Sequence, residues 1–261
     1  MLYFKPKQSI QLYKMKISTT NLIPFVFLLC FSQLVSALSI VAKEETPYIG
    51  NDLPGKGLSI EVINTAFERA GYKTNVIFES WPRAYEGAFI GVYDVLGSVW
   101  RTDEREKDFA FSEPYLFHDI KFIKKKADTE IKFNTLNDLD HLIIGTIKGY
   151  AYRNDFLWAS NFFRLQQNHL IQNLLFLTQD KIDMTLGDVR KVRYEINKYM
   201  KTNMKDLEFL PNSLIKRGVH IAVSKSHPKH KEILTKFNKA LKAMKSDGTY
   251  QSILKTHETI N

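Results

Sequence analysis

The sequence predicts an α/β protein in which short strands alternate with amphipathic helices. Apolar residues recur at helical spacing over 58–70, which ends at Gly71, and again over 228–244. Between such stretches lie short runs of five to seven residues rich in apolar side chains, and the clearest of them, 142–147, ends near Gly149, as is typical of buried strands. No internal repeat or low-complexity tract interrupts the alternation, which indicates an α/β architecture.

The individual elements follow from the spacing of apolar residues and from the residues that end each run. Strands are expected at 38–43, 72–78, 93–99, 142–147, 182–186 and 219–223. Helices are expected at 58–70, from Pro82 to Gly91, around the leucines of 170–175, at 187–200, at 228–244 and, briefly, after the Asp247–Tyr250 turn. A second unit is expected to begin near Lys124–Lys126, which we interpret as an exposed basic stripe.

Residues 1–37 have the features of a secretory signal peptide. The apolar run Asn21–Val35 is preceded by Lys14 and Lys16 and followed by small residues up to Ala37. A positive start, an apolar core too short to span a bilayer comfortably and a small-residue cleavage site define such a signal. Met15 would then serve as the start, and the mature protein would be periplasmic. A membrane anchor is the alternative.

Cleavage after Ala37 would leave 261 − 37 = 224 residues and would remove Cys30, the only cysteine. The mature chain would then have no disulfide, thiol nucleophile or thiolate metal site, and it is long enough to fold without one. Cleavage would also remove the four lysines of the signal peptide, so the formal net charge would fall from +9 to +5. That charge suits anionic partners mildly, and no motif supports nucleic-acid binding.

No cofactor or metal is expected. The sequence contains no Walker A motif, no Gly-x-Gly-x-x-Gly, no Gly-x-Ser-x-Gly and no His-Glu-x-x-His. His227 and His230 have a spacing that suits two ligands on one helix turn, but a third ligand is missing.

The segment Trp100–Tyr115, WRTDEREKDFAFSEPY, is the most informative in the chain. It contains a Thr-x-x-Arg turn that ends at Arg105, a short apolar run, and a corner at Ser112–Tyr115 in which Pro114 fixes a turn. A planar, permanently charged guanidinium such as that of Arg105 matches the two oxygens of a carboxylate. The alternative is a charged turn that simply faces water.

This order of turn and corner resembles the signature of the family 3 extracellular solute-binding proteins, the periplasmic receptors typified by polar amino-acid uptake systems. The resemblance covers essentially the whole mature chain. It implies two lobes, 38–122 plus 221–261 and 123–220, with a hinge where the chain crosses near Phe122–Lys126 and Lys216–Val219 and a ligand cleft between the lobes. It also implies that Arg105 holds the carboxylate of a small ligand.

The resemblance extends to Asp188, at the end of the run 181–188. In the family, the corresponding aspartate accepts hydrogen bonds from the ligand's ammonium group. A carboxylate at the carboxyl end of a strand lies where open α/β sheets place their ligands. The alternative for Asp188 is the N-cap of the following helix, a position that aspartate fills well.

Aromatic residues are expected to wall the cleft. By position relative to the family, Trp81 would cover the aliphatic or cationic part of the ligand and Tyr48 would form the other wall, although core packing is the alternative for both. We also expect Ser98, near the end of a strand, among the ligand-binding residues. Arg83, one turn into its helix, could reach the cleft or only the solvent.

Two departures from the family pattern change what the cleft can hold. Tyr150 follows Gly149 where relatives have threonine or serine, at a helix N-terminus that helps to bind the ligand carboxylate. Trp100 stands where amino-acid binders often keep a small hydroxyl residue. Both departures remove small donors and add bulk, and we count Tyr150 and Trp100 among the residues that face the ligand.

The sequence therefore predicts a monomeric periplasmic protein that binds a small carboxylate-bearing solute, an amino acid or a relative, for an ABC importer. No catalytic residue is required. One alternative is the ligand-sensing component of a signalling system. Another is a cyclohexadienyl-type dehydratase on the same fold, which would need a cleft carboxylate of raised pKa, and Glu45 and Glu79 are the candidates.

Overall fold

The structure, a computed structural model, describes residues 37–200 and 204–258. The expected signal peptide, including Met15 and Cys30, falls almost wholly outside the described residues. Among the helices that are described, none is both long enough and apolar enough to cross a membrane.

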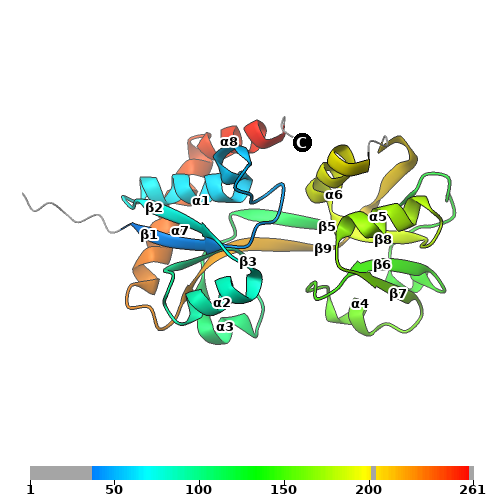
Figure 1. Cartoon of the computed structure of the whole chain (residues 1–261), viewed down its shortest axis with the longest axis horizontal. Coiled ribbons are helices and arrows are strands. Elements are labelled where there is room, and N and C mark those ends of the chain that lie inside the picture. The colour runs from blue at the N-terminus through cyan, green and yellow to red at the C-terminus, as the bar shows by residue number, and fades with distance from the viewer. Residues whose placement is uncertain (1–36, 201–203, 259–261) are drawn as a thin grey trace, which may run out of the picture. The chain divides into compact units, whose positions relative to one another are not determined.

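Strands and helices alternate through most of the described chain, and the predicted α/β architecture is confirmed (Figure 1). The strands are β1 (Leu38–Ala42), β2 (Thr74–Phe78), β3 (Val95–Trp100), β4 (Phe109–Phe111), β5 (Leu116–Lys125), β6 (Ile143–Ile147), β7 (Phe163–Gln167), β8 (Met184–Asp188) and β9 (Leu207–Ser224). The α-helices are α1 (Leu58–Arg69), α2 (Trp81–Phe89), α3 (Arg105–Asp108), α4 (Asn154–Trp158), α5 (Leu170–Thr178), α6 (Val189–Glu195), α7 (His230–Ser246) and α8 (Thr249–Glu258).

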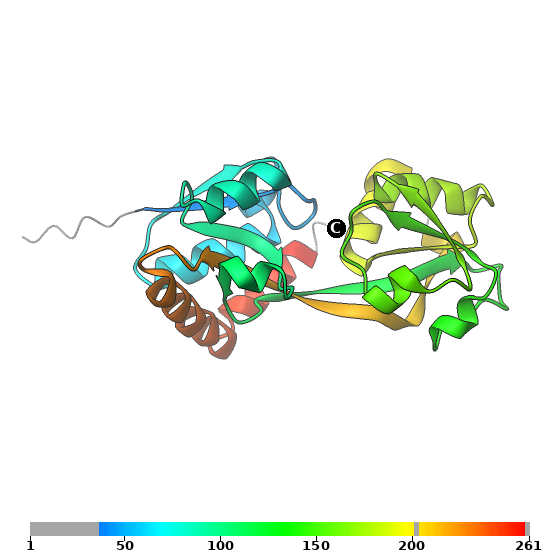
Figure 2. The same ribbon diagram turned by 90° about the horizontal axis from the view of Figure 1, so that it is seen from below.

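The strands join in the order β2-β1-β3-β9-β5-β8-β6-β7, and β4 also pairs with β9. β1 is parallel to β2 and β3, and β6 is parallel to β7 and β8. The long strands β5 and β9 are antiparallel to each other and run between these two parallel groups, as both views show (Figures 1 and 2). Each parallel group is therefore the centre of one lobe, and the β5–β9 pair connects the lobes.

Side chains at different points along β5 and β9 belong to different hydrophobic cores. On β5, Leu116 packs in the core that contains α1 and α7, whereas Ile120 packs in the core around β6 and β8. On β9, Val219 belongs to the first core and Leu214 to the second. On β5 the change of core lies between Leu116 and Ile120, and Phe122 is fully buried in the second core.

The strand β5 and most of β9 are not among the predicted elements. β5 reads LFHDIKFIKK, and its charged and histidine residues hide the apolar alternation that would mark a strand. The expectation that Lys124 lies on an exposed stripe is wrong. Its side chain is buried, with Nζ 2.6 Å from Glu208 Oε1 and 2.9 Å from the carbonyl of Asp128. A buried ammonium requires such partners, and they come from residues that local spacing does not identify.

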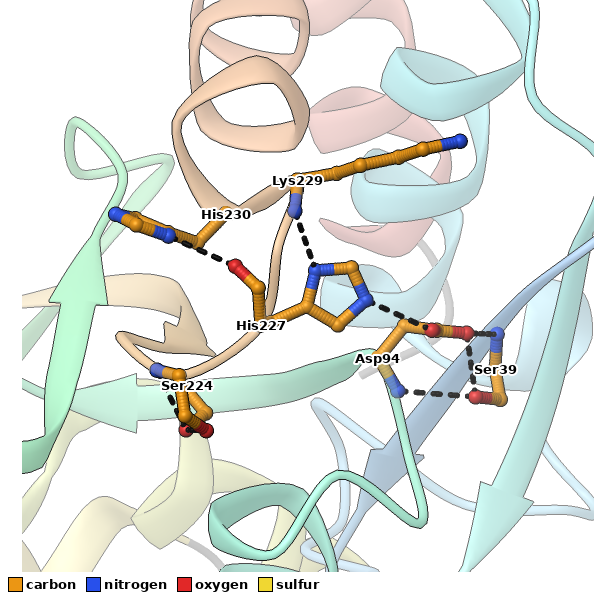
Figure 3. Close-up of polar contacts among 7 residues, drawn as sticks. Ser39, Asp94, Ser224, His227, Lys229 and His230 are labelled. Carbon is orange, nitrogen blue, oxygen red and sulfur yellow. Dashed lines mark hydrogen bonds and ion pairs between the residues drawn. The ribbon is translucent and has the colours of Figure 1, made fainter.

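A carboxylate ties β1 to the segment that precedes α7 (Figure 3). Asp94 Oδ2 accepts hydrogen bonds from the backbone N–H of Ser39 at 2.7 Å and from its hydroxyl at 2.6 Å. Nδ1 of His227 accepts from the backbone N–H of Lys229, so Nε2 carries the hydrogen and donates to Asp94 Oδ1 at 3.2 Å. His230 bonds the carbonyl of His227 at 2.8 Å. Both histidines are therefore used in local hydrogen bonds.

The carboxylate of Asp94 should make the stability of the protein depend on pH. Burial raises the pKa of Asp94, but the hydrogen bonds from Ser39 and His227 outweigh burial and leave the pKa below its usual value. Such a group stabilises the fold above its unfolded pKa of about 4, and this contribution is lost as pH falls through the folded pKa. Asp94→Asn should therefore lower the free energy of unfolding at pH 7 by about 1–3 kcal/mol.

Urea denaturation between pH 7 and pH 3 checks this prediction. The difference between wild type and Asp94→Asn should shrink as the pH falls below about 4 towards the lowered folded pKa, because the unfolded carboxylate takes up its proton first and the folded carboxylate follows. Asp52→Asn, at an exposed position, is the matched control and should change stability by less than about 0.5 kcal/mol. A difference that stays constant with pH would contradict the assignment.

Candidate functional site

A cavity of about 320 Å³ is lined by residues of both lobes. Several of its lining residues lie at or just beyond the carboxyl ends of β1, β3 and β6, the edge at which open α/β sheets hold ligands. Six of the seven residues predicted to bind ligand line it: Tyr48, Trp81, Ser98, Trp100, Arg105 and Tyr150. The structure therefore brings together residues that are as much as 102 positions apart, 150 − 48, at one concave site.

Arg105 is fixed in place by neutral partners. Its Nη1 donates to the carbonyl of Trp100 at 2.8 Å, and its guanidinium lies over the ring of Trp81 at 4.8 Å. In the same turn, Arg101 pairs with Glu106, and Arg105 has no carboxylate partner among the described residues. Burial lowers the pKa of Arg105 from its ordinary value, although the group stays charged. A half-buried, oriented and unpaired guanidinium is suited to receive an anion.

Aromatic rings form the walls around this guanidinium. Trp100 meets Tyr150 edge to face, with 4.9 Å between ring centroids, and its Nε1–H donates to Nδ1 of His118 at 3.1 Å. Tyr48 packs against His118 at 4.4 Å between centroids. Burial, above all, raises the pKa of Tyr150 well above its usual value, so its hydroxyl stays protonated. The walls thus offer apolar area with a few hydrogen-bond donors, a composition typical of small-molecule sites.

Asp188, the seventh predicted residue, does not line this cavity. It is the N-cap of α6, and its Oδ1 accepts hydrogen bonds from the backbone N–H of Lys191 at 3.0 Å and from the hydroxyl of Tyr48 at 2.6 Å. Its Oδ2 accepts from the backbone N–H of Asp119 at 3.0 Å. Burial and the charge of Asp188 raise the pKa of Tyr48 well above its usual value, so Tyr48 remains the donor. Protein donors therefore already satisfy Asp188, and an ammonium contact would have to displace one of them.

The first turn of α6 connects the two lobes at two further points. Lys191 Nζ lies 2.6 Å from Glu45 Oε1. Arg190 donates to the carbonyl of His257 at 3.3 Å. Burial raises the pKa of Glu45, but the charge and hydrogen bond of Lys191 outweigh burial and leave that pKa lowered. Glu45 is therefore an ionised partner of Lys191 and is poorly suited to act as a general acid.

Several charged and polar lining residues are absent from the prediction: Lys43, His118, Lys148, Asn168, His169, Lys191 and Glu195. Glu45, predicted from the sequence only as a candidate carboxylate for a dehydratase, also lines the cavity. His118 lies on β5, which the sequence pattern does not reveal. Since Nδ1 of His118 accepts from Trp100, Nε2 carries the hydrogen, and it has no partner among the described residues. Burial lowers the pKa of His118 and raises that of Glu195. Arg83 does not line the cavity and instead pairs with Glu79 at 3.1 Å, largely in solvent.

The hydrogen bond between Tyr48 and Asp188 should contribute measurably to stability. Tyr48→Phe removes a buried donor from a carboxylate, so the free energy of unfolding should fall by about 1.5–3 kcal/mol in chemical denaturation. Tyr150→Phe is the matched control, since the hydroxyl of Tyr150 has no hydrogen-bond partner among the described residues, and it should change stability by less than about 0.5 kcal/mol. Equal stability of wild type and Tyr48→Phe would contradict the structural role of this bond.

Comparison with known proteins identifies the family. Residues 41–259 match the family described as bacterial extracellular solute-binding proteins, family 3. The chain is 26% identical over 224 residues to a Haemophilus influenzae protein named "Probable amino-acid ABC transporter-binding protein", with 82% of each chain covered. It is 25% identical to the L-cystine-binding protein TcyA of Bacillus subtilis, over 76% of this chain and 71% of that protein.

Among solved structures, the P235GK mutant of ArgBP from T. maritima has the same fold, with a TM-score of 0.66 and 18% identity over 85% of this chain and 95% of that one. The match of the family model extends over most of the described chain and includes the Thr-x-x-Arg turn and the Ser-Glu-Pro-Tyr corner. The chain therefore belongs to the bacterial extracellular solute-binding proteins of family 3.

Proposed function

We propose that this solute-binding protein captures a small carboxylate-bearing solute in the cavity between its lobes and presents it to the membrane permease of an ABC importer. The observation that carries the proposal is Arg105, a half-buried guanidinium that faces the cavity without a carboxylate partner and lies over Trp81. The two relatives are named for amino-acid transport and for L-cystine binding, so amino acids are the first ligand class to test. A signal peptide at 1–37 would place the protein in the periplasm.

Binding would use geometry that is already in place. The hydrogen bond to the carbonyl of Trp100 and the ring of Trp81 hold the guanidinium, so little side-chain entropy is lost when a carboxylate arrives. A ligand that touches both lobes stabilises the conformation in which they meet, by its differential affinity for that conformation. We place the boundaries of the lobes at the changes of core between Leu116 and Ile120 and between Leu214 and Val219.

Neither of the two carboxylates predicted from the sequence for a dehydratase supports that alternative, and the lining carboxylate with a raised pKa is instead Glu195. Glu45 is ion-paired to Lys191 with a lowered pKa, and Glu79 pairs with Arg83 outside the lining of the cavity. A solute-binding role requires no proton transfer and uses the cavity as it stands. A sensing role would use the same cavity and would differ in the membrane partner.

Removing the Arg105 guanidinium should weaken carboxylate binding. In a thermal-shift screen against amino acids and small carboxylates, wild type should show a rise in Tm with at least one compound, because only the folded protein binds it. Arg105→Ala and Arg105→Lys should each weaken that compound's binding by at least about tenfold, since lysine keeps the charge but loses the two-pronged hydrogen bond.

The unliganded Tm separates binding from folding in this test. Arg105→Ala should leave it nearly unchanged, because the removed contacts are one hydrogen bond to a carbonyl and one ring face. Arg83→Ala, on the helix that carries Trp81 but outside the cavity lining, is the matched control and should bind like wild type. A large loss of unliganded stability with retained binding would indicate that Arg105 stabilises the fold and does not bind the ligand, and it would contradict the proposal.

A further inference from the structure

Cations outnumber carboxylates around the cavity. Lys43, Arg105, Lys148 and Lys191 line it, against Glu45 and Glu195, so the formal balance is 4 − 2 = +2. Lys191 and Glu45 neutralise each other at 2.6 Å. Burial raises the pKa of Glu195 from its usual value. Three cations therefore face the cavity against one carboxylate, that of Glu195.

Lys43 and Lys148 occupy equivalent places in the two lobes. Lys43 directly follows β1, which lies between β2 and β3, and Lys148 directly follows β6, which lies between β7 and β8. Each is thus at the carboxyl end of the central strand of a parallel group, where ligands collect in open α/β sheets. Within the described ranges 37–200 and 204–258 neither ammonium forms a salt bridge or a hydrogen bond, although the charge of Lys43 helps to lower the pKa of Glu45, and both side chains are exposed.

The cavity offers little to a cationic ligand group. Asp188 is satisfied by Tyr48 and two backbone N–H groups and does not line the cavity. Glu45 is paired, and Glu195 has a raised pKa. Glu195 is therefore the lining carboxylate that a ligand's ammonium could meet, whereas a second negative group would meet two ammonium groups, one from each lobe.

We propose that the natural ligand is a dianion, with one carboxylate on Arg105 and a second anionic group held between Lys43 and Lys148, and that it needs no ammonium. This inference rests on the proposed function, in which Arg105 binds a carboxylate. Like charges on the two lobes repel when the lobes meet, so a second anion both gains attraction and removes that repulsion. The aromatic walls and the cavity of about 320 Å³ suit a compact dicarboxylate.

Calorimetry with charge-matched pairs tests the proposal. The probes form three pairs: glutarate and its monoamide, phthalate and its monoamide, and L-glutamate and L-glutamine. The two members of each pair differ by one negative charge at nearly constant shape. At least one dianion should bind about tenfold or more tightly than its monoamide, as expected for a charge-assisted hydrogen bond. The preference should shrink as salt is raised, because Lys43 and Lys148 are exposed. Glutarate should bind within about threefold of L-glutamate, a difference of less than 1 kcal/mol.

Variants of Lys43 and Lys148 test where the second anionic group of the ligand binds. Lys43→Gln and Lys148→Gln should each lower the affinity for the dianion by about tenfold and leave that for its monoamide unchanged. Lys239→Gln, exposed on α7 and outside the cavity lining, is the matched control and should change neither affinity.

The outcomes separate this inference from the proposed function. Monoamides that bind as tightly as dianions, or Lys→Gln variants that keep the full preference, would overturn the dianion while leaving carboxylate capture by Arg105 intact. An amino acid that binds far more tightly than its deamino analogue, and loses that advantage in Asp188→Asn, would overturn the statement that no ammonium is needed. If none of the carboxylate probes binds in calorimetry, both proposals are overturned.

Discussion

The antiparallel pairing of β5 with β9 determines how the two lobes are joined and where the cavity forms. From Leu116–Val219 to Lys125–Leu207, backbone hydrogen bonds hold together two strands that each contribute side chains to the core around α1 and α7 and to the core around β6 and β8. Because the pair passes through both lobes, the parallel groups around β1 and β6 end near a common junction. Trp100, at the end of β3, packs against both cores at that junction and lies beside Arg105. The cavity is thus a consequence of the connection between the lobes.

Much of the fold could be predicted because it follows from local periodicity. The amphipathic helices α1 and α7 and the apolar strands β1 and β6 appear where their spacing indicates. β5 could not be predicted, because a strand that receives partners from both sides can hold lysines, a histidine and an aspartate. The burial of Lys124 depends on Glu208, which lies 84 positions away, 208 − 124, and no local pattern carries that information. The discontinuous first lobe was implied only by the family resemblance.

The residues of the candidate site also fall into some that the sequence could predict and others that it could not. Arg105 and the aromatic walls could be predicted because they stand within, or at a fixed distance from, a recognisable motif. His118, Lys43 and Lys148 carry no motif, and their place at the cavity becomes visible only when the sheet is assembled. Asp188 had two plausible roles, and the structure displays the helix cap together with a bond to Tyr48, 140 residues earlier. The pocket's charge balance likewise emerges only from the assembled set of side chains.

We expect an anionic solute to bind between the lobes with its carboxylate on Arg105. A crystal structure of the protein with the tightest carboxylate found by calorimetry would reveal whether this contact forms. Both carboxylate oxygens should lie within hydrogen-bond distance of the Arg105 guanidinium, with the remainder of the ligand between Trp81, Trp100 and Tyr150. A ligand bound elsewhere, or bound in this cavity with its carboxylate away from Arg105, would show that Arg105 does not hold the carboxylate.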